Sequence, residues 1–246
     1  MKKKKTAPKK ETVKESDLYP CVAEYFTRMG FTVKGEVKGC DVVAIKDEQM
    51  TIIELKKVFN VKLLYQCTRR LALTDLVYAA TLIPKKSASV SQWTLMRSLC
   101  RRLHIGLLLV DLDSKKVKLV CEPGDFAGRK NPRSGLKVVK EFAGRKVAVN
   151  DGGTTGVKLE TAYLETSIQI AVLLSQNPRS SAGQLVKLGS DAVKTSRILQ
   201  NNYYHWFEKI ERGKYSLKKG QALKIQKLYP KIWEFYFRQT KLDTKE

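Results

Sequence analysis

The chain has 246 residues, of which 47 are Lys or Arg and 24 are Asp or Glu, giving a formal net charge of +23 at pH 7. Such a charge favours a polyanionic partner, either nucleic acid or an anionic membrane surface. The longest apolar run, near His104–Asp111, is far below the roughly 20 residues of a membrane helix, no apolar segment follows the basic start, and the five cysteines form no CxxC pair. We therefore expect a reduced, cytoplasmic protein without a signal peptide, membrane segment, disulfide framework or zinc site.

The first half of the chain is predicted to form an α/β domain. Residues 1–13 lack apolar periodicity and are expected to be a disordered basic tail. Apolar residues then recur at helical spacing in some segments, whereas other segments are short, β-branched runs between turn residues. The spacing predicts helices over 16–30, 60–75 and 91–104, and strands over 31–37, 40–45, 50–58, 76–84, 105–112 and 115–123. Residues 14–123 thus read as one domain in the order α-β-β-β-α-β-α-β-β.

The second half begins with a change in composition. Residues 124–157 are rich in Gly, Lys and Arg and contain "FAGRK" twice, which predicts a basic linker. Three predicted helices follow, then a hairpin that turns at Arg212-Gly213, and a final amphipathic helix in which Pro230 is a candidate break. The predicted elements are helices over 159–177, 180–189, 190–206 and 221–240, and a hairpin over 207–219. This order is that of a winged helix-turn-helix, so residues 158–246 are predicted to be a DNA-binding domain.

The stretch "GCDVVAIKDEQMTIIELKK", residues 39–57, contains charged side chains within apolar runs. Burying a charge is costly unless it is paired or bound to a metal. Side chains alternate along a strand, so Glu54 and Lys56 share one face. If Asp47-Glu48 is a two-residue turn, Lys46 lies opposite Gln49 and Asp41 lies opposite Glu54, about 5 Å apart at Cβ; a longer loop would shift this register.

Two opposed carboxylates favour a divalent cation between them, and hard oxygen ligands suit Mg²⁺ or Mn²⁺. Asp41 and Glu54 are therefore the candidate metal ligands, completed by water, the Leu55 carbonyl and substrate phosphate oxygens. Lys56 would orient a water or stabilise the transition state. The alternative is an ordinary Glu–Lys cluster on a solvent-facing strand.

The layout resembles the PD-(D/E)XK phosphodiesterases. A helix starting near Glu15, then "GCD", then "IIELK", then a helix with Gln66 are similar to that superfamily. The sequence also resembles an uncharacterised bacterial family assigned to it, through "KESDLYP", "GEVKGCDVVA", "RLALTD" and "LQNNYYHWFEKIERGKYSL". The resemblance covers roughly residues 15–220 and implies a restriction-endonuclease-like mixed sheet flanked by helices, followed by a small winged-helix domain.

The resemblance also implies roles for individual residues. Asp41 and Glu54 would ligate metal, Lys56 would serve the water, Glu15 would act as base or second-metal ligand, and Gln66 would complete the site. Glu36 or Glu24 could substitute for Glu15. The sequence departs from the family pattern in having "CD" for "PD", and Arg69-Arg70 after Gln66 where a Q-x-x-x-Y pattern has Tyr.

In a winged helix the third helix enters the major groove and the wing contacts the backbone. The residues predicted to contact DNA are Lys194, Thr195, Arg197, Gln200 and Asn201 on that helix and Arg212 and Lys214 at the wing. The leading hypothesis is a Mg²⁺- or Mn²⁺-dependent nuclease that acts on DNA. A DNA-binding protein with an inactive nuclease-like domain is the alternative, and RNA as substrate and a homodimer are left open.

Overall fold

A computed structural model of the chain describes residues 13–84, 90–147, 150–154 and 160–242. Except for residue 13, the predicted basic tail lies outside the described residues. The chain divides into two units, of which unit 1 comprises residues 1–139 and 150–157, and unit 2 comprises residues 140–149 and 158–246. In the described part of the chain, no helix has the length and apolar character needed to cross a bilayer.

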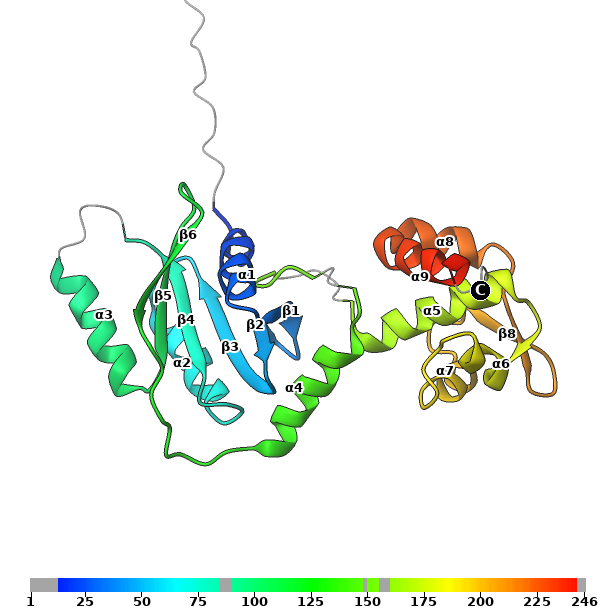
Figure 1. Cartoon of the computed structure of the whole chain (residues 1–246), viewed down its shortest axis with the longest axis horizontal. Coiled ribbons are helices and arrows are strands. Elements are labelled where there is room, and N and C mark those ends of the chain that lie inside the picture. Colours follow the sequence, from blue (N-terminus) through cyan, green and yellow to red (C-terminus); the bar gives the residue numbers. More distant parts are fainter. Residues whose placement is uncertain (1–12, 85–89, 148–149, 155–159, 243–246) are drawn as a thin grey trace, which may run out of the picture. The chain divides into compact units, whose positions relative to one another are not determined.

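Unit 1 is built on a six-stranded mixed sheet in the order β1-β2-β3-β4-β5-β6 (Figure 1). The strands are β1 (Thr32–Val37), β2 (Cys40–Lys46), β3 (Gln49–Lys56), β4 (Val77–Leu82), β5 (Gly106–Asp111) and β6 (Lys116–Cys121). β3, β4 and β5 are mutually parallel, whereas the other neighbouring strands are antiparallel. The two parallel crossovers each contain a helix, as parallel neighbours require. The predicted mixed α/β class and the strand order along the chain are confirmed.

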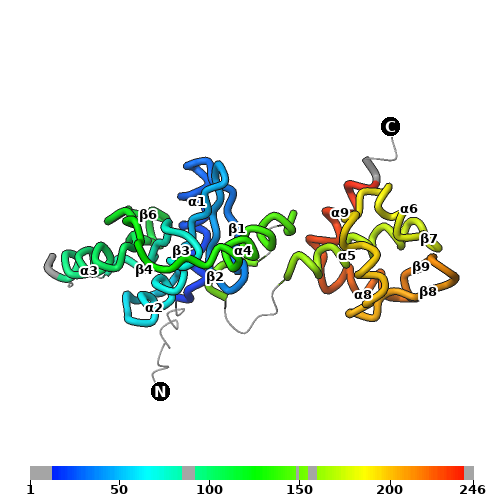
Figure 2. Tube along the Cα trace, turned by 90° about the horizontal axis from the view of Figure 1, so that it is seen from below, coloured from blue at the N-terminus to red at the C-terminus, as the bar shows by residue number. Residues whose placement is uncertain are grey.

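Helices cover both faces of this sheet, and Figure 2 shows α1 and α2 on opposite sides of the strands. The helices are η1 (Glu15–Leu18, a 3₁₀ turn), α1 (Tyr19–Arg28), α2 (Val61–Arg70) and α3 (Val90–Arg102). η1 and α1 bury Leu18, Val22 and Phe26 against one face. α2 and α3 bury residues such as Leu63 and Cys100 against the other. Two apolar layers thus hold the sheet between helices.

The turn between β2 and β3 has the two-residue length that the sequence predicted. Lys46 pairs with Gln49 and Val42 pairs with Ile53. Asp47 and Glu48 have φ of +47° and +65°, as a type I′ turn requires, although neither residue is the usual Asn or Gly. Continued by one step, this register puts Asp41 opposite Glu54, so the predicted register is confirmed.

The segment 124–157 is more ordered than the predicted linker. Its residues Pro132–Gly144 form helix α4, which places Val138 and Phe142 in buried positions. Residues 150–154 then return to unit 1 and pack on β1 at Gly35, where an added Cβ would lie 2.6 Å from the Asn150 carbonyl oxygen. The sequence predicted neither the helix nor the return to unit 1, because a segment rich in Gly and Lys is typical of a linker.

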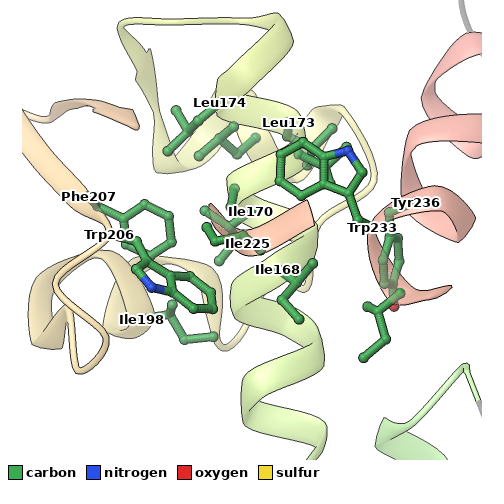
Figure 3. Packing of buried hydrophobic residues seen from close by; sticks show 14 of the residues in the cluster. Ile168, Ile170, Leu173, Leu174, Ile198, Trp206, Phe207, Ile225, Trp233 and Tyr236 are labelled. Carbon is green, nitrogen blue, oxygen red and sulfur yellow. The ribbon is translucent and has the colours of Figure 1, made fainter. Parts of the chain in front are cut away.

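Unit 2 contains six helices and a three-stranded sheet in the order β7-β9-β8 among its described residues. They are the end of α4, then α5 (Ala162–Gln176), β7 (Ser180–Ser181), α6 (Ala182–Lys187), α7 (Thr195–Asn201), β8 (Phe207–Glu211), β9 (Lys214–Leu217), α8 (Gln221–Leu228) and α9 (Pro230–Leu242). Figure 3 shows α5 at the centre of the core, with Ile168 and Leu173 lying between Trp206 on one side and Trp233 on the other. The candidate break at Pro230 separates α8 from α9.

The third helix of this unit, α7, is much shorter than the predicted 190–206. Before it, the Asp191 carboxylate accepts the N–H groups of Val193 and Lys194, both at 2.9 Å. At its end, Asn202 has φ of +43°, and its side chain bonds both the N–H and the carbonyl of Phe207. These local side-chain bonds compete with the helix and confine it to seven residues.

Candidate active site

The candidate site lies where β2 begins and β3 ends, at one end of these two neighbouring inner strands. The Asp41 carboxylate accepts the backbone N–H of Leu55 at 2.8 Å, and it lies close enough to the Glu54 carboxyl to raise the pKa of that group. Glu54 has no exposure to solvent. The structure therefore brings together the two carboxyl groups that the register pairs, on the face of the sheet that α2 covers.

Helix α2 supplies the partners of Glu54. Asn60 caps this helix by accepting the Leu63 N–H at 3.0 Å, which satisfies a free donor of the first turn. One face of the helix then points Gln66 and Arg70 at the strand: Arg70 Nε lies 2.6 Å from Glu54 Oε1 and Gln66 Nε2 lies 3.3 Å from Oε2. Both oxygens of the buried carboxyl thus have a donor from α2.

Arg70 is a site residue that the sequence interpretation missed. In the sequence, Arg70 is visible only as a departure from the Q-x-x-x-Y pattern, because a single sequence does not show which strand a helix faces. The available signal was spacing, since residues four apart lie on one side of a helix and Arg70 follows Gln66 by four. Arg70 also donates to the Gly39 carbonyl, so it joins the β1–β2 turn to Glu54.

Lys56 and Glu15 form the second ion pair of the site. Lys56 Nζ lies 2.5 Å from Glu15 Oε2, and their side chains are 11% and 24% exposed. Glu15 stands in η1, so it reaches Lys56 from the segment that precedes α1. Of the two residues considered as substitutes, Glu24 is exposed and paired with Arg28, whereas Glu36 is buried beside Asp41 and accepts the Thr154 N–H at 2.9 Å.

The electrostatics of the two carboxyls follow from burial. Loss of solvent raises the pKa of Glu54 to about 7, and the charge of Asp41 adds to this rise while Arg70 opposes it. Burial also raises the pKa of Asp41, against the Leu55 N–H and Lys56, which lower it. One proton is thus held readily by the pair near neutral pH.

Two basic grooves border the site in unit 1. The site groove, of about 700 Å³, is lined by Lys14, Glu15, Ser16, Lys56, Lys57, Asn60, Lys62, Gly153 and Thr154. The second groove, of about 370 Å³, is lined by Lys38, Arg69, Arg70, Ala72, Leu73, Asn131, Ser134, Lys137 and Val138. Lys56 and its partner Glu15 line the first groove, and Arg70, the partner of Glu54, lines the second.

The donors present fit a hard divalent cation. Asp41 and Glu54 offer carboxylate oxygens that repel each other, and Gln66 Oε1 is buried without a protein partner, so it can accept from a bound water. Among the described residues there is no group of three or more Asp, Glu, His or Cys that could hold a metal ion. Mg²⁺ typically uses one or two carboxylates, with water and substrate phosphate as its other ligands, so two carboxylates suffice.

The predicted DNA contacts of unit 2 lie on its surface with one exception. Arg197, Gln200 and Asn201 on α7, and Arg212 and Lys214 at the hairpin turn, are exposed. Lys194 is partly exposed and paired with Asp191 at 3.1 Å. Thr195 is fully buried. Its hydroxyl bonds the Asp191 carbonyl at 2.6 Å, so it closes the turn before α7 and cannot contact DNA, which corrects that prediction.

Arg70 should be a stability determinant. Replacing it by Met leaves the buried Glu54 carboxylate without a cation, which costs about 3–5 kcal/mol when one partner of a buried pair is removed. We expect Arg70→Met to lower the free energy of unfolding by that amount in urea titrations above neutral pH. Adding Glu54→Gln to it should recover much of the loss.

The matched control for Arg70 is Arg28→Met, because the Arg28–Glu24 pair is exposed, with side-chain exposures of 77% and 52%. Exposed pairs contribute little, so the midpoint of that variant should not move measurably. Equal midpoints for Arg70→Met and Arg28→Met would contradict the role given to Arg70.

The raised pKa of Glu54 predicts how stability depends on pH. The unfolded chain loses the Glu54 proton around the ordinary pKa of 4.5, whereas the folded chain keeps it until the pH approaches about 7. This contribution is full below the unfolded pKa and is lost as pH rises through the folded one. The melting temperature of the metal-free protein should therefore fall across this window, and Glu54→Gln should flatten the fall. The exposed-turn variant Glu48→Gln serves as control; a parent-like slope in Glu54→Gln would refute the assignment.

Comparison with known proteins agrees with the nuclease-like layout. Residues 108–222 match the model of a family described as "Putative PD-(D/E)XK phosphodiesterase (DUF2161)". The chain matches no curated protein and no solved structure. The matched stretch is less than half of the chain and begins within β5, after Asp41, Glu54 and Lys56. It therefore indicates phosphodiesterase chemistry for the family, while the site itself rests on the geometry above.

Proposed function

We propose that this protein is a metal-dependent nuclease that hydrolyses DNA phosphodiester bonds with Mg²⁺ or Mn²⁺. One observation carries the proposal: the carboxyls of Asp41 and Glu54 lie together where β2 begins and β3 ends, and the charge of Lys56, which shares a face of β3 with Glu54, acts on Asp41. Two acids and an amine at the end of a strand pair suit hydrolysis of a charged ester. The family match supports the reaction class.

Each residue of the site then has a role in the proposed reaction. Asp41 and Glu54 would hold the cation, which when bound lowers the pKa of a coordinated water and neutralises phosphate charge. Lys56 stabilises the negative charge that grows on the phosphate oxygens as hydroxide adds and the ester P–O bond breaks. Glu15 fixes the Lys56 amine through their ion pair. Arg70 and Gln66 hold the Glu54 carboxyl in position.

The two grooves support a polyanionic substrate. The site groove contains four lysines and one carboxylate, and the second groove contains two lysines, two arginines and no acidic residue. Each groove includes one cation of the site, Lys56 in the first and Arg70 in the second. A sugar–phosphate backbone that follows both grooves would pass the site with its charge neutralised by Lys and Arg.

The element order of unit 2 supports a role in binding DNA. The order α5-β7-α6-α7-β8-β9, with β7 pairing β9, corresponds to that of a winged helix-turn-helix. α7 would be the recognition helix, with Arg197, Gln200 and Asn201 toward the bases. The turn at Arg212-Gly213 would be the wing, with Arg212 and Lys214 toward phosphates.

Catalysis can be tested with Mg²⁺ or Mn²⁺ on plasmid and branched DNA. Asp41→Asn should lose metal-dependent cleavage, and Lys56→Ala should lower its rate roughly 10²- to 10³-fold, as removal of one transition-state donor does. Lys116→Ala, on the exposed side of β6, is the control for a lost surface charge and should cleave like the parent.

A parallel calorimetric titration with Mn²⁺ separates the nuclease from the alternative of a DNA-binding protein with an inactive domain. The nuclease proposal expects Mn²⁺ binding by the parent that Asp41→Asn abolishes. DNA binding without any metal-dependent turnover, or cleavage that survives both Asp41→Asn and Lys56→Ala, would reject it.

The winged-helix assignment predicts salt-dependent binding by unit 2. Arg212→Ala should weaken affinity for all sequences alike and reduce the slope of log K against log salt by about one, as loss of one phosphate contact does. Arg197→Ala should also change the sequence preference if it contacts a base. Fluorescence anisotropy over a salt series measures both, with Lys227→Ala on α8 as the control. An unchanged slope in Arg212→Ala would remove the hairpin turn from the interface.

A further inference from the structure

The outer face of α2 presents apolar side chains to solvent next to the site. Val61 is 81% exposed and Tyr65 is 62% exposed. Leu63 and Cys67, on the opposite side of the helix, are buried in unit 1. Val58, in the loop before the helix, is also 66% exposed. Apolar exposure gathered beside a charged groove marks an interaction site more often than scattered surface residues do.

Cations flank this face on both sides. Tyr65 follows Lys62 by three residues and precedes Arg69 by four, so all three are neighbours on the helix surface. Lys62 lines the site groove and Arg69 lines the second groove. The Arg69 guanidinium lies 5.9 Å from the centre of the Tyr65 ring, which restrains the ring. The tyrosine therefore stands between the two grooves that a phosphate backbone would follow.

We propose that Val61, Tyr65 and Arg69, here called the α2 stripe, bind an unpaired base of the nucleic acid beside the bond to be cut. This rests on the proposed function. A base offers a flat apolar face between two phosphates, and the stripe offers an aromatic ring between two cationic grooves. Bases inside a duplex hide those faces, so the stripe selects single-stranded, frayed or branched DNA.

The charges around the stripe favour this occupant over an apolar protein segment. The exposed charged neighbours of Tyr65 on the helix are Lys62 and Arg69, and Lys57 precedes the helix. A protein partner would need carboxylates placed to match the cations on either side of Tyr65. In a nucleic acid, the phosphates on either side of a base supply such regularly spaced negative charges.

The test is binding of labelled oligonucleotides to the full chain in EDTA, so that nothing is cleaved. Three probes of matched sequence are compared by fluorescence anisotropy: a single strand, a blunt duplex and a fork with unpaired arms. Tyr65→Ala should weaken binding of the single strand and the fork roughly 5- to 150-fold, since stacking on one aromatic contributes about 1–3 kcal/mol per base. Binding of the blunt duplex should stay near the parent.

Further variants separate stacking from charge and from misfolding. Tyr65→Phe keeps the ring and should bind as the parent does. Leu95→Ala removes an equally exposed apolar side chain from α3 and should change nothing. Tyr65→Ala should leave the slope of log K against log salt unchanged, whereas Arg69→Ala should reduce it. Circular dichroism spectra that match the parent establish that the variants fold.

Two results would overturn the inference: Tyr65→Ala binding all three probes like the parent, or Tyr65→Ala losing affinity for all three equally. Neither depends on catalysis. A parent that discriminates the fork through Tyr65 but never cleaves would reject the nuclease and keep the stripe. If the parent cleaves DNA but Tyr65→Ala retains the full preference for the fork, the nuclease proposal stands and the role of the α2 stripe is rejected.

Discussion

The Glu54 carboxyl, which has no exposure to solvent, can remain in the sheet because α2 brings Arg70 and Gln66 against its two oxygens. An unpaired carboxylate in such a place would be costly. The partners in turn fix the rotation of α2 over β3 and, through the Gly39 carbonyl, the turn that precedes Asp41. The geometry of the whole site thus depends on one buried acid and the arginine that accompanies it.

The same arrangement pairs the charges of the site. Each of its two cations has an acidic partner, Glu15 for Lys56 and Glu54 for Arg70. The remaining lysines of the grooves lie at the surface, where solvent tolerates them. The two acids lie at the end of the β2–β3 pair and the bases lie around them, which is the charge distribution on which the proposed binding of a cation and a polyanion rests.

Much of unit 1 could be predicted because its signals are local. The alternation of β2 and β3 and the two-residue turn at Asp47-Glu48 were enough to predict that Asp41 faces Glu54. Arg70 was missed because its partner is distant in the sequence, and helix orientation is a tertiary property. Thr195 was misassigned because a threonine at the start of a helix reads the same whether its hydroxyl faces solvent or closes a turn.

The prediction of a linker over residues 124–157 was wrong for another reason. A composition rich in Gly and Lys is typical of a linker even where the segment folds. Gly35 and Gly152 carry no side chain at the points where this segment approaches β1 and Asp41. Such close approaches of backbone to backbone leave no periodic pattern in the sequence. The site itself depends on which distant side chains the fold brings together, and no local pattern records that.

The return of residues 150–154 to unit 1 has a consequence for how the protein can be divided. The chain enters unit 2 after Val139, comes back at Asn150 and leaves again after Val157. Neither unit is therefore a continuous piece of the gene product. A fragment that stops at residue 123 would lack Gly153 and Thr154, which line the site groove. It would also lack the Thr154 N–H that donates a hydrogen bond to Glu36. A single cut in the chain, whether made by recombination, by a protease or by subcloning, therefore cannot separate the two units, because each consists of two segments that alternate along the polypeptide.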